Sequence, residues 1–288
     1  MSLKWMCLTD DGIVTVLPPI TSLADFHKAQ WELGSVFFHA NPVLRPEESK
    51  IYFRGDHFGR HLGGDRKTST QSLLATFEKY RCKCAAKDEV PWYTYVRMRH
   101  SGVRNTALLD WTASPEIALW FAIHEDDGSL KKFKTGVLWA FKYKDEDEEF
   151  PENEDNPIPS NGGTKSVVCL SNNEVMHCFC EGDGDWGERP TMQRAAVVRL
   201  RLLEPDKNGM QVLLPMDKDP QFRGRLIKID VEGNYEFINA ELNLWLEQEI
   251  FSREIRFRRY LGLDNRRNER DYDVVQKLNA NYEKEFMK

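Results

Sequence analysis

Residues 99–125, RHSGVRNTALLDWTASPEIALWFAIHE, contain the clearest structural signals in the chain. Ser114 can cap a helix N-terminus, Pro115 suits the first helical position, and Glu116 complements the positive end of the helix dipole. The residues that follow, up to Ile123, are apolar on nearly every side, which is typical of a helix inside a domain. The stretch therefore predicts a central, buried helix that begins at Pro115.

A carboxylate and an indole, Asp110 and Trp111, directly precede this helix. A charge beside a buried helix needs an ion pair or hydrogen bonds, so Asp110 requires a partner. Arg54 is the candidate, because it follows an apolar run, 51–53, that is typical of a buried strand. Two interpretations stay open. Arg54 and Asp110 could form an ion pair that holds two motifs together, or the guanidinium could bind a diphosphate while Gly55 lets the ligand approach the backbone.

Length and composition describe an ordinary globular protein. The chain has 288 residues, of which 41% are apolar and 30% charged, enough for one large domain or two small ones. We find no apolar run that could cross a bilayer and no signal-peptide pattern, so we expect a cytoplasmic protein without a membrane partner. The six cysteines are expected to be free thiols. A net charge of -6 argues against general affinity for nucleic acids.

The apolar periodicity predicts an α+β fold, with a central sheet flanked by helices and further helices at the C-terminus. Short connections make the sheet mostly antiparallel. We expect a single domain over 1–288, with a flexible insertion near 145–165 and a helical part over 233–288. The strands are expected at 13–17, 51–53, 137–143, 167–170, 175–180, 196–203, 211–214 and 226–231.

Two motifs resemble those of the FRG domain, a family named after a Phe-Arg-Gly tripeptide. The tripeptide is Phe53-Arg54-Gly55, and the second motif is Leu108-Leu109-Asp110-Trp111-Thr112 followed by Ser114-Pro115. The single residues that fit the same pattern are His100, Gly102 and Thr106. FRG domains look like relatives of the ADP-ribosyltransferases, so the resemblance implies a split sheet that binds NAD.

The resemblance also implies roles for individual residues. Arg54 would hold NAD, in a cofactor pocket formed by Tyr52, Arg54, Gly55, Thr106 and Trp111. The catalytic residues would be Arg54, His100, Asp110 and Gln193, with Gln193 on a late strand. The chain departs from the family pattern in three places: Arg99 replaces the usual glutamine, the segment 104–107 up to Ala107 is one residue longer, and Ala195 stands where an arginine-type transferase has glutamate.

The candidate side chains also have structural interpretations. Trp111 could stack on a nicotinamide or base, or be a core aromatic whose N–H is satisfied. His100 could act as a general acid or base, donate to a ribose hydroxyl, or cap a helix end. No metal site is predicted, because the ligand-type residues over 56–65 lie in a glycine-rich loop and the cysteines lack C-x-x-C spacing.

A basic cluster lies late in this acidic chain. Residues 251–270 contain seven arginines and three acidic residues, interleaved with aromatic side chains. The pattern suits RNA or DNA, through phosphate contacts and base stacking, and the candidate contacts are Arg256, Arg258 and Arg259. The alternative is a solvated helix face paired with the acidic run 145–149.

Three functions follow as hypotheses. The first, implied by the resemblance, is an intracellular ADP-ribosyltransferase-like enzyme that consumes NAD. It would be a toxin or anti-phage effector that modifies nucleic acid or protein, with an antitoxin or regulatory protein as partner. The second is a non-catalytic module that binds a nucleotide or RNA. The third is a partner-binding protein without a small ligand.

Overall fold

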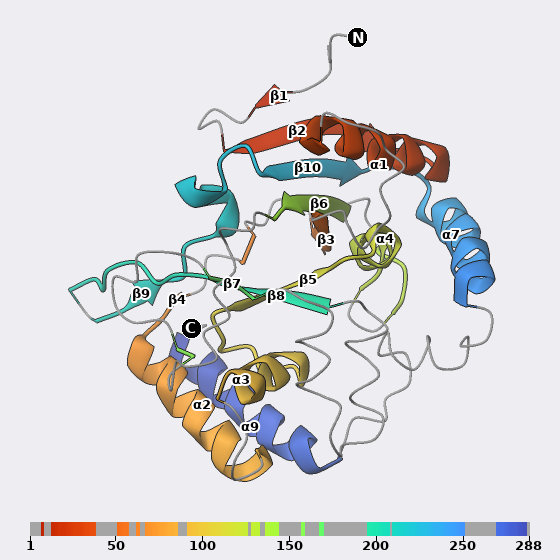
Figure 1. Cartoon of the computed structure of the whole chain (residues 1–288). Coiled ribbons are helices and arrows are strands. Elements are labelled where there is room, and N and C mark those ends of the chain that lie inside the picture. Colours follow the sequence, from red (N-terminus) through yellow and green to blue (C-terminus); the bar gives the residue numbers. More distant parts are fainter. Residues whose placement is uncertain are drawn as a thin grey trace.

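The computed structural model shows an α+β protein in which helices flank an eight-stranded sheet (Figure 1). The structure describes residues 7–8, 13–38, 51–57, 62–63, 67–85, 91–125, 128–132, 136–143, 157–158, 167–169, 195–207, 209–250 and 269–286. Within these residues the expected α+β class is confirmed. No helix in the described ranges is long and apolar enough to cross a membrane.

The large sheet is mixed rather than antiparallel. Its order is β1 (Cys7–Leu8), β2 (Val14–Ile20), β10 (Leu226–Val231), β6 (Gly136–Lys142), β3 (Ile51–His57), β5 (Leu108–Thr112), β8 (Ala195–Arg199) and β7 (Val167–Cys169). β2 and β10 are parallel, whereas the other described neighbours are antiparallel. The parallel pair joins strands that are far apart in the chain, so short connections could not reveal it.

β3 joins two halves of this sheet. It pairs with β6 along its whole length, from Ile51 to His57, but with β5 only where Phe53 lies opposite Thr112. β5 pairs with β8, and β8 with β7; in Figure 1 these three strands lie below β3, on the side away from β2 and β10. The sheet is therefore divided beside β3. An ADP-ribosyltransferase-like fold stays a prediction.

Two strand predictions need correction. Residues 211–214 were expected to extend the central sheet, but β9 (Gln211–Val212) pairs with β4 (Lys67–Thr68) in a separate two-stranded sheet. The strand expected at 196–203 is shorter, because β8 ends at Arg199. The strand expected at 175–180 and most of the insertion at 145–165 lie outside the described residues.

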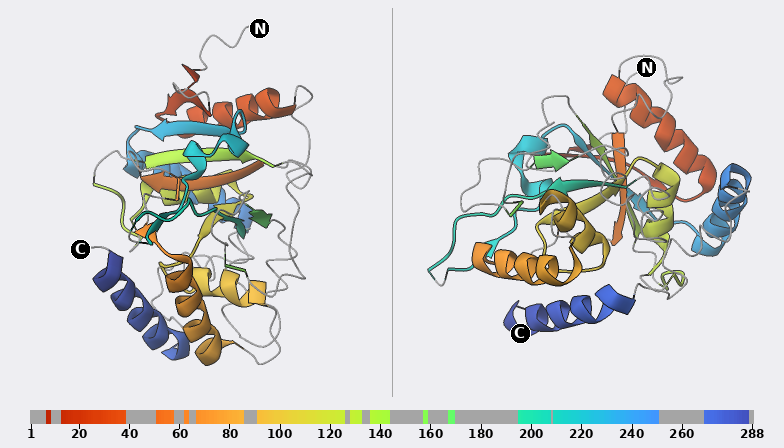
Figure 2. Two further views of the ribbon diagram at one scale, coloured as in Figure 1. Left: turned by 90° about the vertical axis from the view of Figure 1, so that its left-hand side faces the viewer. Right: turned by 60° about the horizontal axis from the view of Figure 1, so that its bottom comes forward.

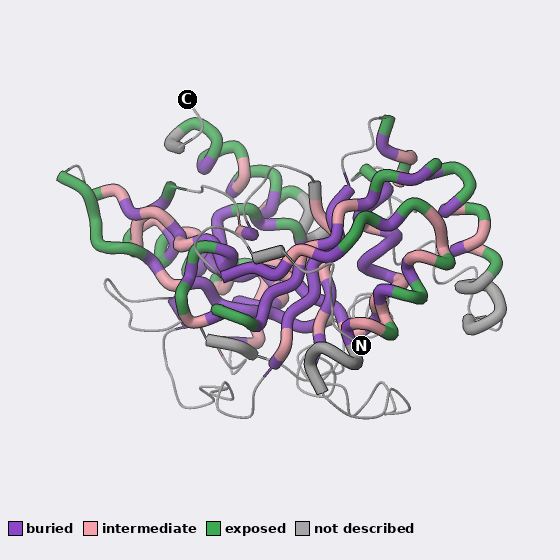
Figure 3. The backbone as a smooth tube through the Cα atoms, turned by 90° about the horizontal axis from the view of Figure 1, so that it is seen from above, coloured by how far each residue is buried: buried purple, intermediate pink, exposed green. Residues whose placement is uncertain are grey.

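Helices cover both faces of the sheet (Figures 1 and 2). On one side lie α1 (Leu23–Phe38), α4 (Pro115–Ile123) and α7 (Tyr235–Ile250), around a core that includes Phe53 and Leu138. On the other lie α2 (Thr70–Cys84), α3 (Pro91–His100) and α9 (Glu269–Phe286), over a core that includes Trp111 and Phe141. The strands and α4 are largely buried, whereas the outer helices expose one face (Figure 3).

The central helix begins where its sequence predicts. The Ser114 hydroxyl accepts a hydrogen bond from the Ile117 N–H at 3.3 Å, and Pro115 occupies the first turn of α4. The buried residues of this helix are Ile117, Ala118, Leu119, Trp120, Ala122 and Ile123. Local capping and all-round apolar character therefore predicted a core helix correctly.

α4 lies so close to β3 that Gly55 has no room for a side chain. A Cβ atom there would meet the Ala118 carbonyl oxygen at 2.1 Å and the Ala122 nitrogen at 2.3 Å. Gly136, on the neighbouring strand, would meet the Ala122 carbonyl at 2.3 Å. The expectation that Gly55 admits a ligand is therefore wrong, because backbone atoms of α4 already occupy the space beside it.

We predict that Gly55→Ala lowers the free energy of unfolding by about 1–3 kcal/mol or more, since α4 must move away from the sheet. Urea unfolding of both proteins measures this change. An alanine variant as stable as the wild-type protein would contradict the close contact of α4 with β3.

Candidate functional site

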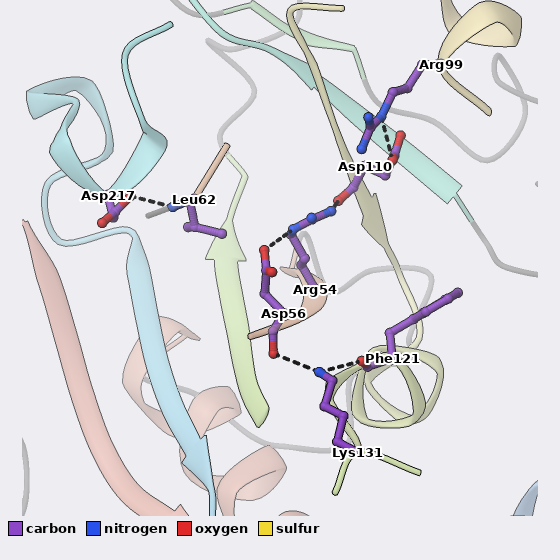
Figure 4. Close-up of polar contacts among 8 residues, drawn as sticks. All are labelled: Arg54, Asp56, Leu62, Arg99, Asp110, Phe121, Lys131 and Asp217. Carbon is purple, nitrogen blue, oxygen red and sulfur yellow. Dashed lines mark hydrogen bonds and ion pairs between the residues drawn. The ribbon is translucent and has the colours of Figure 1, made fainter. Parts of the chain in front are cut away.

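Arg54 links the two halves of the sheet. Its Nε donates to Oδ2 of Asp56 at 3.0 Å, and its Nη1 donates to the backbone carbonyl of Asp110 on β5 at 2.8 Å (Figure 4). The side chain is 20% exposed. The third nitrogen, Nη2, donates to no described residue. Arg54 is therefore anchored on two sides and keeps one donor group for another acceptor.

The Asp110 carboxylate pairs with Arg99, not with Arg54. Nε of Arg99, the residue next to the end of α3, donates to Oδ2 of Asp110 at 2.8 Å (Figure 4). The Arg54–Asp110 ion pair, one of the two interpretations that the sequence left open, is therefore wrong, because Arg54 contacts the Asp110 backbone and pairs with Asp56 instead. Arg99, which stands where the FRG resemblance implies a glutamine, supplies the counter-ion.

The Asp110 carboxylate is anionic in the folded protein. Burial raises its pKa, but the positive charges of Arg99, His100 and Arg54 and the hydrogen bond from Arg99 together outweigh burial, so the pKa lies below its ordinary value. Oδ1 of this carboxylate is buried and accepts no hydrogen bond from the described residues. Asp110 thus presents one acceptor oxygen that the described protein leaves unused.

The end of β3 is held by a buried lysine that sequence reasoning missed. Nζ of Lys131 donates to the carbonyl oxygens of Ala122 at 2.7 Å, Phe121 at 3.3 Å and Asp56 at 3.4 Å, and the residue is 5% exposed. Its charge lies at the C-terminus of α4, where the helix dipole favours a cation. Lys131 thus ties the strand that carries Arg54 to the central helix (Figure 4).

The chain after β3 is also anchored. Asp217 follows β9 and is 8% exposed, and its Oδ1 accepts the Leu62 N–H at 2.7 Å (Figure 4). This bond spans 155 residues of sequence, so no local pattern could have revealed it.

The expected cofactor-contacting residues lie in the core. Trp111 is 3% exposed and packs against Phe141, with ring centroids 5.6 Å apart. Thr106 is 1% exposed, and Tyr52 is half-buried against Tyr143. The structure thus brings Trp111 and Arg54 onto adjacent strands, but the indole face is covered by core side chains and is no open stacking surface.

His100 ends α3 beside Arg99, and its positive charge contributes to the low pKa of Asp110. The expected position at a helix end is therefore confirmed, while its role stays a prediction.

Gln193 lies outside the described residues, as do the three arginines of the basic cluster, Arg256, Arg258 and Arg259. In the described ranges, no group of three His, Cys, Asp or Glu side chains could hold a metal ion.

One family comparison bears on this site. Residues 29–130 match the family model of the FRG domain. The matched segment includes β3, which carries Phe53-Arg54-Gly55, and the β5–α4 unit, so the match supports the FRG family. No curated protein and no solved structure matches the chain.

We predict that Asp110→Asn lowers the free energy of unfolding at neutral pH by about 1–3 kcal/mol, since it removes a charge-assisted hydrogen bond to Arg99. The pKa of Asp110 is lower in the folded state, so its stabilising effect exists above the ordinary value of 3.8 and disappears as the pH falls through the folded-state pKa.

The difference in free energy of unfolding between the wild-type protein and Asp110→Asn should therefore shrink as the pH falls. Urea unfolding across the pH range measures it. Asp273→Asn, at an exposed position of α9, is the matched control and should leave the stability unchanged. A stability loss that is the same at every pH would contradict an ionised Asp110.

Proposed function

We propose that this protein binds a nucleotide at Arg54 and Asp110, that the nucleotide is NAD, and that the protein transfers ADP-ribose from it. One observation carries the proposal. Nη1 of Arg54 lies 2.8 Å from the backbone oxygen of Asp110, which places the guanidinium, with its unused Nη2, in the same neighbourhood as the unused carboxylate oxygen Oδ1 of Asp110. Phosphate oxygens accept hydrogen bonds and ribose hydroxyls can donate them, so a nucleotide complements both groups.

In this scheme Arg54 binds the diphosphate through Nη2, and the anionic Asp110 accepts a hydrogen bond from a ribose hydroxyl. The bond between nicotinamide and ribose breaks, and its electron pair leaves with neutral nicotinamide. The ribosyl cation forms a bond with a nucleophilic oxygen or nitrogen of the target, which loses its proton to a base. A nearby carboxylate stabilises the developing positive charge. His100, next to Arg99 at the end of α3, is the proposed acid–base group.

The target and setting rest on the family resemblance. We propose that the acceptor is a nucleic acid or a protein inside the cell, and that the activity serves as a toxin or anti-phage effector under the control of an antitoxin or regulatory protein. A nucleic-acid target would use Arg256, Arg258 and Arg259, whose cluster is the most basic stretch of the chain.

A non-catalytic nucleotide- or RNA-binding module is the second candidate, and one observation favours it. Ala195, opposite Thr112 at the start of β8, occupies the position at which the resemblance implies a transferase glutamate. Alanine has no group that could orient the ribose or the acceptor. Binding in this candidate uses the same two groups, Arg54 and Asp110.

Calorimetric titration with NAD and ADP-ribose, together with an assay of nicotinamide release, tests the proposal. We expect Arg54→Gln to weaken binding by about 10- to 100-fold, the effect of one lost charge-assisted hydrogen bond. Thermal unfolding of the variant checks that the sheet still forms. Arg223→Gln, at an exposed turn, is the control and should bind like the wild-type protein.

Binding with nicotinamide release supports the transferase. Binding without release in the presence of nucleic-acid and protein targets supports the binding module. The proposed site is wrong if the wild-type protein binds neither nucleotide, or if the Arg54 variant binds them unchanged.

A further inference from the structure

Four hydrogen-bond donors form a row across the sheet through Arg54. Arg54 on β3 lies opposite Trp139 on β6, and Trp139 lies opposite Lys228 on β10. Directly opposed residues in antiparallel strands point to the same face. Phe53 is paired with Thr112 on β5, so the next residues along the two strands, Arg54 and Trp111, also share a face. The row is therefore Trp111, Arg54, Trp139 and Lys228.

Burial and ring contacts support this arrangement. Trp111 and Trp139 belong to the same core cluster, together with Phe141, which lies two residues from Trp139 on β6. Trp111 contacts Phe141 across β3, with 5.6 Å between ring centroids. The two indoles therefore flank the strand position that carries Arg54.

The two indole N–H groups have no acceptor in the described part of the chain. Both tryptophans are 3% exposed, and Nε1 of each is buried and donates to no described residue. An indole nitrogen can only donate, and a buried donor without an acceptor costs free energy. Two such donors on either side of a guanidinium complement a ligand that is rich in oxygen acceptors.

Lys228 repeats the arrangement of Arg54 at the other end of the row. Nζ of Lys228 pairs with Oδ1 of Asp230 at 2.9 Å, two residues along β10, as Arg54 pairs with Asp56 two residues along β3. The Lys228 side chain is 23% exposed, close to the 20% of Arg54. Neighbouring strands lie about 4.8 Å apart, so the two cations rise from backbones roughly 10 Å apart, with Trp139 between them.

We infer that Trp139 and Lys228 extend the Arg54 site across β6 to β10 and bind a diphosphate between the two cations. Arg54 reaches toward β5 and leaves Nη2 without a described acceptor, the flexible Lys228 side chain extends from β10, and the Trp139 N–H between the two strands can donate to a phosphate oxygen. The ligand class is thus a diphosphate ester, of which NAD, ADP-ribose and nucleoside diphosphates are examples. This inference rests on the proposed function, because it uses the same site.

Titration with inorganic pyrophosphate and with ADP-ribose tests the inference. We expect Lys228→Gln to weaken the binding of both about tenfold, since one charge-assisted contact is lost. Trp139→Phe keeps an aromatic ring and removes only the indole portion with its N–H, so we expect a loss of several-fold. Lys207→Gln in an exposed turn and Trp120→Phe in the opposite core cluster are the matched controls, and both should bind like the wild-type protein.

The outcomes separate this inference from the proposed function. If Lys228→Gln and Trp139→Phe bind both probes unchanged while Arg54→Gln does not, the inference is wrong and the Arg54 site stands. If Lys228→Gln loses binding and Arg54→Gln retains it, the anion site lies on β10 and the site proposed at Arg54 is wrong. Failure of the wild-type protein to bind either probe overturns both. Lys228 is partly exposed, so its variant keeps the test valid even where Trp139→Phe does not fold.

Discussion

The contact of α4 with β3 is the constraint on which the rest of the structure depends. The α4 backbone lies directly on Gly55, so one face of β3 packs against the core formed with α1, α4 and α7. The Phe-Arg-Gly tripeptide thereby acquires three separate roles. Phe53 fills the core beneath α4, Arg54 reaches from the opposite face to β5, and Gly55 permits the close approach of the helix. Strand alternation assigns these roles, because successive side chains point to opposite faces.

Charged side chains continue this arrangement across the divided sheet. Asp56, Arg54, Asp110 and Arg99 form a chain of contacts from β3 through β5 to α3, and each half-buried charge has an opposite charge or a backbone acceptor beside it. Such a chain orients the groups that it contains. The structural and the ligand-binding interpretations of Arg54 are therefore compatible, since the contacts that join the strands also hold one nitrogen and one carboxylate oxygen in place.

The segment that matches the FRG family model does not contain all the strands around Arg54. β3 lies within residues 29–130, but its partner β6 begins at Gly136, and β10 and β8 come later still. The C-terminal helix α9, also outside the matched segment, contacts the turn that precedes β5. Asn279 accepts the Arg104 N–H at 2.9 Å and donates to the Gly102 carbonyl at 3.0 Å, so α9 holds the turn between α3 and β5. Figure 2 shows α9 beside α2, on the side of the sheet that carries α3.

The sequence by itself determined the local elements and the need of Asp110 for a partner. The sequence predicted the cap at Ser114, the strand β6 and the need of a buried carboxylate for a partner. These features depend on residues a few positions apart or on charge alone. Only the tertiary structure decided which cation pairs with Asp110, why residue 55 is glycine, that β2 and β10 run parallel, and that Trp139 and Lys228 line up with Arg54. These features arise from strand register and helix approach between distant segments, and hydrophobic pattern and local propensity do not specify which distant strands become neighbours.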